Sequence, residues 1–501
     1  MMKKLILLIV LSLTYLLTVA QEWSIHYAGA YPAGCIHFHD GFIDEAGVTF
    51  LAGQEGANPD TPDALFMRIE SDGNHTEFKY AKEGFRSRIT SVIELPDHNL
   101  FAAGNLYGDT TDYVLVLILD KQLDLLEEKQ YEKEMEGNSF GPCRAAIDSH
   151  GHAIVSTVVT RNNAYQGIDY RGVFFKFDPQ GNMITSRYLI EDYPDPLYFL
   201  TDFRLRQMWY KPEEDNLLCL APGYGNVLSF ITFDSAFNYI DEYQIWQDDI
   251  DKSDHTLSRD CYTDYWYNED EALFFSSRGD ADHNKLRVSR VNTHGEILEY
   301  IHLNERTDTI DDAAQPKCMA TANDSTFYFN FYYHTWSYYP GTACVYLLND
   351  RLEIIGRHVD DEHHCYRSCM VLATADGGCL TVNDSCNYNG ITVTSRPIIQ
   401  KLTLEDFETI PLSIVQSGMG QETGTAFPNP CDEVLHIPIP FYDSSDIRCL
   451  VTDQMGRIVI DTKTLSGCRL DLIVSRLRTG LYHYRIHNPD KTLLTGQFYK
   501  K

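Results

Sequence analysis

Short apolar runs separated by polar turns recur along most of the chain. Each unit begins with a polar turn and a short apolar strand, as in Gly47-Val-Thr-Phe-Leu-Ala-Gly and Asn99-Leu-Phe-Ala-Ala-Gly. The same pattern starts again at Gly151, Asn216, Glu271, Ser325 and Gly378. Subtracting the residue numbers gives spacings of 52 to 65 residues. A period of this length indicates a repeat architecture.

A second apolar strand, followed by a tight turn, lies further on in each unit. These second strands start at Leu65, Val114, Val173, Leu228, Leu286, Val345 and Ile399. The turns are rich in Asp, Asn and Gly, and Asn and Gly tolerate the positive φ that hairpin turns require. The two markers therefore agree on seven units between about Gly34 and Pro411.

Each unit predicts two β-hairpins, and a four-stranded sheet repeated at this period is typical of a β-propeller. The run from Val114 to Leu119 fits, because strands covered on both faces need not alternate. Two other all-β arrangements have the same units: a string of small two-hairpin sandwiches and an open β-solenoid. We expect a seven-bladed β-propeller over residues 21–411, since closure removes exposed sheet edges.

The pattern changes after Pro411. Residues 412–425 contain no apolar run and predict a linker. Beyond it, strands alternate between buried and exposed positions, with Leu435, Ile437 and Ile439 on one face and Tyr482, Tyr484 and Ile486 on another. Residues 426–501 therefore predict a small immunoglobulin-like antiparallel β-sandwich.

Specific residues in this C-terminal region occur in a characteristic order. They are Pro428, Asn429, Pro430, Asp453, Gly456, Arg457, Gly480 and Tyr482, followed by the basic end Lys500-Lys501. This order resembles the type A C-terminal sorting domain of the type IX secretion (Por secretion) system of Bacteroidetes. The resemblance implies export across the outer membrane, the type IX machinery as a partner, and a secreted or cell-surface location. It implies nothing about the activity of the rest of the chain.

The first twenty residues predict a secretory signal peptide. Two lysines precede the apolar run Leu5 to Leu17, and small residues lead to a cleavage site after Ala20. The apolar run is shorter than the roughly 20 residues that a membrane-spanning helix requires. We expect no membrane span in the mature chain.

The charge of the chain narrows the classes of partner. The sequence has 41 basic and 72 acidic residues, a formal net charge of -31. Such a surface repels nucleic acid and anionic lipid, so we expect neither as a partner. The length of 501 residues predicts at least two domains.

Thirteen cysteines in an exported chain leave two alternatives, disulfide bridges or mostly free thiols. Cys219 lies in an apolar strand-like run, where a thiol acts as a small hydrophobic group. A closer group has the spacing for one or two bridges: Cys365, Cys369, Cys379 and Cys386.

We find no catalytic or metal-binding motif with a strong signal. The sequence lacks Gly-x-Ser-x-Gly, His-Glu-x-x-His and Gly-x-x-x-x-Gly-Lys. The segment Asp249 to Asp260 resembles a calcium loop, but Asp254 stands where the turn requires Gly. His363-His364-Cys365 and Cys369 include metal-ligand types without a second cysteine pair. We expect no cofactor and no metal site, with calcium as the weak alternative.

An aromatic segment in the sixth unit is the candidate ligand site. Tyr333, Trp336, Tyr338 and Tyr339 lie between its two hairpins, where exposed rings would stack on sugars or seat a peptide. The alternative is that these rings are buried between blades. We expect a secreted or cell-surface binding module for a glycan or protein ligand. The alternative is a polysaccharide-active hydrolase or lyase whose acidic residues come from several blades.

Overall fold

The structure is a computed structural model, and a substantial part of the chain is described in it. The described residues are 22–27, 35–56, 62–109, 111–132, 139–163, 167–188, 207–222, 228–245, 262–266, 271–279, 284–302, 309–313, 317–323, 326–335, 338–388, 393–409, 431–438, 447–453, 457–464, 469–487 and 492–501. The predicted signal peptide and the predicted linker lie outside them. The chain divides into two compact units, Met1–Thr409 and Ile410–Lys501.

Five antiparallel sheets follow one another along the first unit. The first contains β2 (Cys35–Ile43), β3 (Thr49–Gly56), β4 (Pro62–Ile69) and β5 (His75–Tyr80). The second contains β6 (Arg86–Glu94), β7 (Leu100–Tyr107), β8 (Asp112–Leu119) and β9 (Leu125–Glu132). The third contains β10 (Ser139–Phe140), β11 (Arg144–Ile147), β12 (Ala153–Asn163), β13 (Gly167–Phe177) and β14 (Met183–Tyr188). The fourth contains β15 (Gln207–Lys211), β16 (Asn216–Pro222), β17 (Leu228–Asp234) and β18 (Tyr239–Gln244). The fifth contains β19 (Tyr262–Trp266), β20 (Glu271–Gly279), β21 (Asn284–Asn292) and β22 (Ile297–His302).

A nine-stranded sheet completes the first unit. It contains β1 (Trp23–His26), β23 (Thr309–Ala313), β24 (Met319–Asn323), β25 (Thr326–Thr335), β26 (Tyr338–Asn349), β27 (Ile354–Ala373), β28 (Cys379–Tyr388), β29 (Val393–Leu402) and β30 (Glu408–Thr409). A short 3-10 helix, Leu404–Asp406, precedes β30. The N-terminal strand β1 pairs with β29, so the two ends of this unit meet in one sheet.

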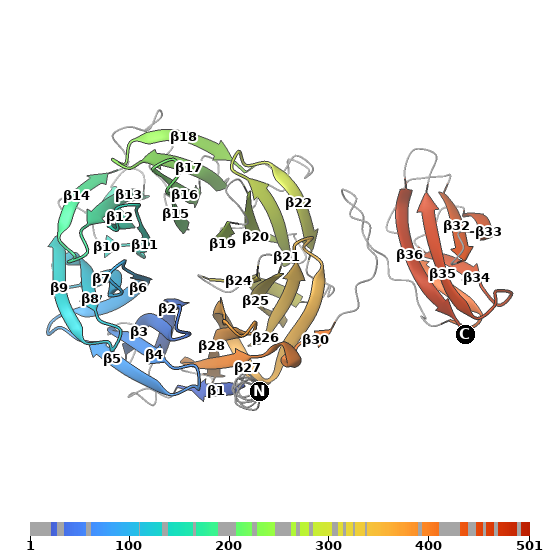
Figure 1. The fold of residues 1–501 in the computed structure, drawn as a ribbon, viewed down its shortest axis with the longest axis horizontal. Helices are drawn as coiled ribbons and strands as arrows, with labels where there is room; N and C mark the ends of the chain where they lie inside the picture. The colour runs from blue at the N-terminus through green and yellow to red at the C-terminus, as the bar shows by residue number, and fades with distance from the viewer. Residues whose placement is uncertain are drawn as a thin grey trace, which may run out of the picture. The chain divides into compact units, whose positions relative to one another are not determined.

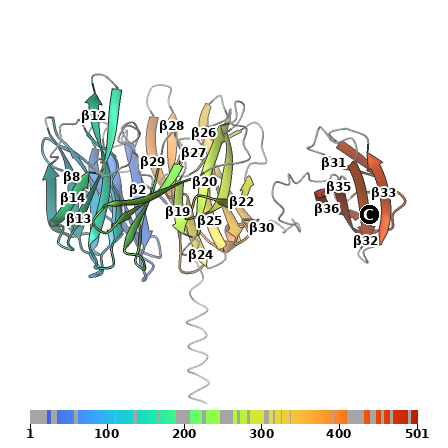
Figure 2. The same ribbon diagram turned by 90° about the horizontal axis from the view of Figure 1, so that it is seen from above.

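The sheets of the first unit stand around a ring, with β2, β6 and β15 toward its centre and β5, β9, β14 and β18 on its rim (Figure 1). Seen edge-on, the strands run from one side of the ring to the other (Figure 2). Neighbouring sheets share apolar cores: Phe101 of the second sheet and Phe177 of the third lie in one cluster, with ring centroids 5.7 Å apart. Burial on both faces explains why Val114 to Leu119 is uninterrupted apolar sequence.

One five-residue turn closes ten hairpins in the described part of this unit. Its first residue exchanges backbone hydrogen bonds with the fourth and fifth, a type I turn followed by a bulge. The turns begin at Asp44, Glu70, Leu95, Asp120, Asp148, Asp178, Asp234, Asn292, Asn349 and Thr374. The fourth residue has positive φ in every case, including the buried Leu123, Phe237 and Leu352.

The second unit contains two antiparallel sheets. A four-stranded sheet has the order β33 (Ile458–Thr464), β32 (Ile447–Asp453), β35 (Gly480–His487), β36 (Thr492–Lys500). A two-stranded sheet pairs β31 (Val434–Pro438) with β34 (Arg469–Ile473). The predicted faces are confirmed for Leu435, Ile437, Tyr482, Tyr484 and Ile486, which share one buried cluster, whereas Ile439 lies outside the described residues.

Seven cysteines among the described residues are buried as thiols and not joined in disulfides: Cys143, Cys219, Cys318, Cys344, Cys379, Cys431 and Cys449. The expectation that Cys219 acts as a small hydrophobic group is confirmed, and burial raises the pKa of its thiol. Cys379 is not bridged, which removes it from the predicted disulfide group. Among the residues that the structure describes, no helix is long and apolar enough to cross a membrane.

Candidate functional site

The strands of the ring have two ends, and the connections between strands differ from one end to the other. The five-residue turns join the first strand to the second, or the third to the fourth, within a sheet, so in antiparallel sheets they share one end. Turns of neighbouring sheets also touch: Lys121 Nζ lies 2.7 Å from the Asp44 carboxylate. We call this side of the strands the turn end and the opposite side the connection end.

The predicted aromatic segment belongs to the connection end. It joins β25 to β26, the second and third strands of their group, and Thr335 pairs with Tyr338 there. Tyr333, Tyr338 and Tyr339 lie in these strands by their backbone, but their side chains and all of Trp336 fall outside the described residues. Their role as ligand contacts stays a prediction.

A histidine held by a buried carboxylate lies on the connection-end half of the ring's inner strands. His37 of β2 has its Nδ1 atom 2.8 Å from Oδ2 of Asp384, which lies on β28 of the nine-stranded sheet. The Asp384 side chain is fully buried, whereas His37 is 27% exposed. The ring of His39 stacks on that of His37 with centroids 6.4 Å apart. A carboxylate in this position fixes the tautomer and orientation of an imidazole.

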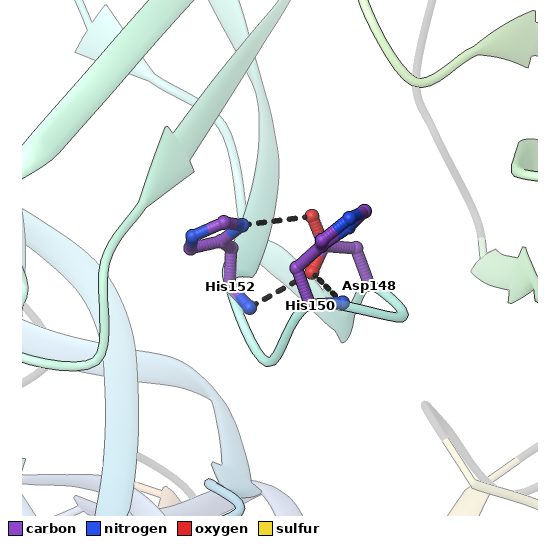
Figure 3. A group of neighbouring side chains, drawn as sticks. All are labelled: Asp148, His150 and His152. Atoms are coloured by element: carbon purple, nitrogen blue, oxygen red, sulfur yellow. Dashed lines mark hydrogen bonds and ion pairs between the residues drawn. The ribbon is translucent and has the colours of Figure 1, made fainter.

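A second cluster of chemically active side chains lies at the turn end. Asp148, His150 and His152 occupy alternate positions of the turn between β11 and β12 (Figure 3). One ligand atom from each lies within 4.8 Å of the others. The spacing Asp-x-His-x-His is visible in the sequence, but the cluster is not among the sites predicted from it.

The Asp148 carboxylate is the centre of this cluster. Its Oδ1 atom accepts the backbone N–H groups of His150 at 2.8 Å and His152 at 2.9 Å. Its Oδ2 atom lies 2.7 Å from Lys176 Nζ and 3.1 Å from His152 Nδ1. Burial alone would raise the pKa of Asp148, but Lys176 and these donors lower it to about 2. The carboxylate is therefore ionised at neutral pH.

A serine of the same turn contacts the exposed imidazole of this cluster, and a tyrosine of the fourth sheet contacts that serine. Ser149 Oγ lies 3.2 Å from His150 Nδ1 and 3.1 Å from the Tyr210 hydroxyl. Tyr210 in turn donates to the Asp215 carboxylate. The rings of His150 and His152 stack with centroids 5.9 Å apart and planes 19° apart. The three ligand-type side chains are thus held by neighbours on two sheets.

In the second unit, the structure describes four of the predicted sorting-signal residues. Asp453 accepts the Arg457 backbone N–H at 3.0 Å and its Nε at 2.8 Å, which closes the hairpin between β32 and β33. The Arg457 side chain is 77% exposed. Tyr482, two positions after Gly480 in β35, is buried and donates its hydroxyl to the Arg478 carbonyl at 2.9 Å. Pro428, Asn429, Pro430 and Gly456 lie outside the described residues.

Other predicted positions also fall on residues of which the structure gives no side-chain description. The calcium-like segment Asp249 to Asp260 is one, and His363, His364, Cys365 and Cys369 are the others. These expectations remain untested.

Comparison with known proteins identifies the C-terminal region. Residues 425–498 match the family described as "Secretion system C-terminal sorting domain". The predicted resemblance is confirmed, and the chain is one that is secreted and either attached to the cell surface or released. No curated protein matches the chain significantly.

Solved structures resemble the chain only weakly. A protein of unknown function from Dyadobacter fermentans has a TM-score of 0.41 at 9% identity, over 65% of this chain and 97% of its own. Polysaccharide lyase Uly1 has a TM-score of 0.42 at 9% identity, over 74% of this chain and 90% of its own. A family PL25 ulvan lyase has a TM-score of 0.42 at 9% identity, over 77% of this chain and 98% of its own. Likeness at this level carries no conclusion about the function of this chain.

Proposed function

From the sorting domain at its C-terminus and the ring that precedes it, we propose that this protein is an exported β-propeller that binds a glycan or protein ligand outside the cell. The type IX machinery would export the chain through residues 426–501, an immunoglobulin-like sandwich after a linker at 412–425. The ligand would sit on the connection end of the ring.

The strand pairing supports seven blades. Strand β27 pairs with β26 through residues up to Cys365, and with β28 from Cys365 to Ala373. Its two halves therefore serve as the outer strand of one blade and the inner strand of the next. The nine-stranded sheet then counts as two blades beside the five separate sheets, with β1 as the outer strand of the last. Such pairing of the N-terminal strand closes a ring without an exposed edge.

The asymmetry between the two strand ends carries the proposal of a binding face. The turn end is built from short turns whose polar groups are used within the turn, such as Asp178 Oδ1, which accepts the Gln180 and Asn182 amides. The connections from β14 to β15 and from β18 to β19 start and finish at the connection end, as the predicted aromatic segment does, and they are longer in sequence than the five-residue turns. Binding residues occur disproportionately on such long connections positioned by a rigid scaffold.

The pair His37 and Asp384 favours a second candidate, a polysaccharide-active hydrolase or lyase. An imidazole oriented by a buried carboxylate, with its other face partly exposed, has the arrangement of a general base. The two candidates share a location and differ in whether a bound glycan is cleaved.

One experiment separates them. The purified mature chain is applied to a panel of immobilised plant, algal and bacterial polysaccharides, and both retention and released oligosaccharides are measured. The binding proposal expects saturable retention without products. Product release that His37→Ala abolishes, without loss of retention, would replace it with the enzymatic candidate. An absence of both retention and products across the panel, and across a matching panel of outer-membrane proteins, would contradict both.

A further inference from the structure

The turn at Asp148 contains two histidines that the structure of the turn does not require. The Asp44 turn of the first sheet has the same geometry: Asp44 Oδ1 accepts the Ala46 and Val48 amides, both at 2.9 Å. A lysine amine also lies 2.7 Å from Oδ2 in both turns, from Lys121 and Lys176 respectively. The aspartate and the lysine therefore stabilise the turn, whereas the two histidines are an addition.

We propose that Asp148, His150 and His152 form a binding site for a divalent transition-metal ion of the Zn²⁺ class. Imidazole nitrogens with a carboxylate oxygen are a ligand set that such ions prefer. The proposal departs from the expectation of no metal site in the sequence, and it stands independently of the ligand-binding function of the ring.

The distances within the cluster suit a single ion. Ligands about 2.0–2.1 Å from a tetrahedral ion lie about 3.3 Å from one another. The closest pair, His152 Nδ1 and Asp148 Oδ2, is 3.1 Å apart, and all three ligand atoms lie within 4.8 Å. The His150 ring is exposed, and its ligand nitrogen must move closer to the other two ligand atoms to share the ion. The backbone amides on Oδ1 keep Asp148 fixed and leave Oδ2 for the ion.

Neighbouring groups have the roles of outer ligand partners. Ser149 Oγ at His150 Nδ1 holds one ring nitrogen, so the other is the one presented to the ion. Tyr210 fixes that hydroxyl from the fourth sheet. Three protein ligands leave at least one position for water. Because His150 is exposed and the His152 side chain is 29% exposed, the ion reaches the site from solvent.

Lys176 opposes the ion. Its amine occupies the Oδ2 side of Asp148 at 2.7 Å and must move away when the ion binds. The site should therefore bind more weakly than a closed structural zinc site. Replacing Lys176 by Gln removes the competing charge, so the variant should bind the ion more tightly than the native chain.

The test uses the untagged mature chain, freed of metal by a chelator and titrated with ZnCl₂ by calorimetry at two protein concentrations. We expect one equivalent that is lost in the double variant His150→Ala, His152→Ala. Affinity should fall by more than about 100-fold, since even outer partners cost about 10–100-fold. The affinity of the Ser149→Ala variant for Zn²⁺ should be about 10-fold lower, because Ser149 is such an outer partner. The matched control is His98→Ala, because His98 is a 74% exposed histidine in an equivalent turn.

Other histidines and cysteines of the chain also offer ligand atoms for zinc, so the criterion is the equivalent lost on substitution. If the double variant binds as many ions with the same affinities as the native chain, the site is refuted. A half-equivalent that appears only at the higher protein concentration would mean an ion shared between two chains, and would also refute it. Circular dichroism melting of each variant verifies the fold, which exposed turn substitutions should preserve.

Discussion

Lys317 forms an ion pair with Asp40, Nζ to Oδ1 at 2.7 Å, although the two residues are far apart in the sequence. Lys317 Nζ also donates to the Gly41 carbonyl at 2.7 Å. Asp40 Oδ2 accepts Ser91 Oγ at 3.0 Å and the Val92 amide at 2.8 Å. One buried carboxylate thus joins the first sheet, the second sheet and Lys317, which forms an isolated bridge with Met370 of β27 in the nine-stranded sheet.

Replacing Lys317 by Met should therefore destabilise the ring. Asp40 is only 7% exposed, and a buried charge without its partner costs about 3–5 kcal/mol. Asp40 would keep its hydrogen bonds from Ser91 Oγ and from the Val92 and Gly41 amides, which places the expected loss near the lower figure. Urea denaturation of the mature chain measures this loss. The control is Lys129→Ala, whose exposed pair with Glu127 is worth less than about 1 kcal/mol. Equal effects of the two substitutions would show that the central pair has no special weight.

Substitution of Gly73 should destabilise the ring more than substitution of Gly47, because Trp23 of the N-terminal strand packs against Gly73. Gly73 and Gly47 both have positive φ, 88° and 80°. A Cβ on Gly73 would lie 2.9 Å from the Trp23 ring, whereas one on Gly47 would meet nothing within 4 Å. Gly47→Ala should cost about 1–2 kcal/mol from backbone strain alone. Gly73→Ala should cost about 1–3 kcal/mol more from overpacking. Denaturation midpoints that agree within error would place Trp23 elsewhere than against this turn.

Asp44 should make the stability of the ring fall in acid. Burial raises the pKa of its carboxyl, but the Lys121 hydrogen bond and the Val48 and Ala46 amides together lower it below the usual value. A depressed pKa in the folded state gives stability that is present above about pH 4, the unfolded value, and is lost as pH falls through the folded value. The difference in unfolding free energy between the native chain and Asp44→Asn should be about 1–2 kcal/mol at pH 7. It should shrink steadily below pH 4, and a difference that grows there would contradict the assignment.

Arg457 should matter for export more than for stability. Its side chain is 77% exposed and pairs with Asp453 at 2.7 Å, so Arg457→Ala should cost less than about 1 kcal/mol. If the secretion machinery contacts this residue, less of the Arg457→Ala variant should reach the cell surface. The measurement is the fraction of the protein that an added protease degrades on intact cells. The matched control is Arg448→Ala, which breaks a similar exposed pair with Asp461 in the same sheet. Normal surface display of Arg457→Ala would mean that its place in the sorting motif is structural only.

Local patterns in the sequence were sufficient to predict the strands. The apolar strands predicted at the start of the units, such as those from Asn99 and Gly378, correspond to β7 and β28. The apolar strands predicted further on in the units, from Val114 and Val345, correspond to β8 and lie within β26. These elements are encoded by neighbouring residues, through alternation, apolar runs and turn residues with positive φ.

Contacts between distant residues were beyond the reach of the same reasoning. Nothing local to Trp23 to His26 says that it pairs with Lys401 to Ile398, and nothing near Lys317 names Asp40 as its partner. The His37 and Asp384 pair is equally non-local. The Asp148 cluster is different, because its three residues are neighbours in sequence. The spacing alone does not predict this cluster, because the same turn occurs elsewhere without histidine and the sequence does not reveal how the imidazole rings are oriented.

The most direct test of the account compares the two strand ends of the ring. Trp336→Ala and Tyr338→Ala alter the connection end, while Tyr243→Ala removes an aromatic ring that packs on the turn residue His294, with centroids 4.9 Å apart. Each variant is measured on the polysaccharide or outer-membrane protein that retains the native chain. We predict that the connection-end variants weaken binding by at least about 10-fold, the loss typical of an aromatic residue central to an interface, while Tyr243→Ala binds normally. Loss of binding in Tyr243→Ala alone, with the connection-end variants unchanged, would place the ligand on the turn end and contradict the proposal.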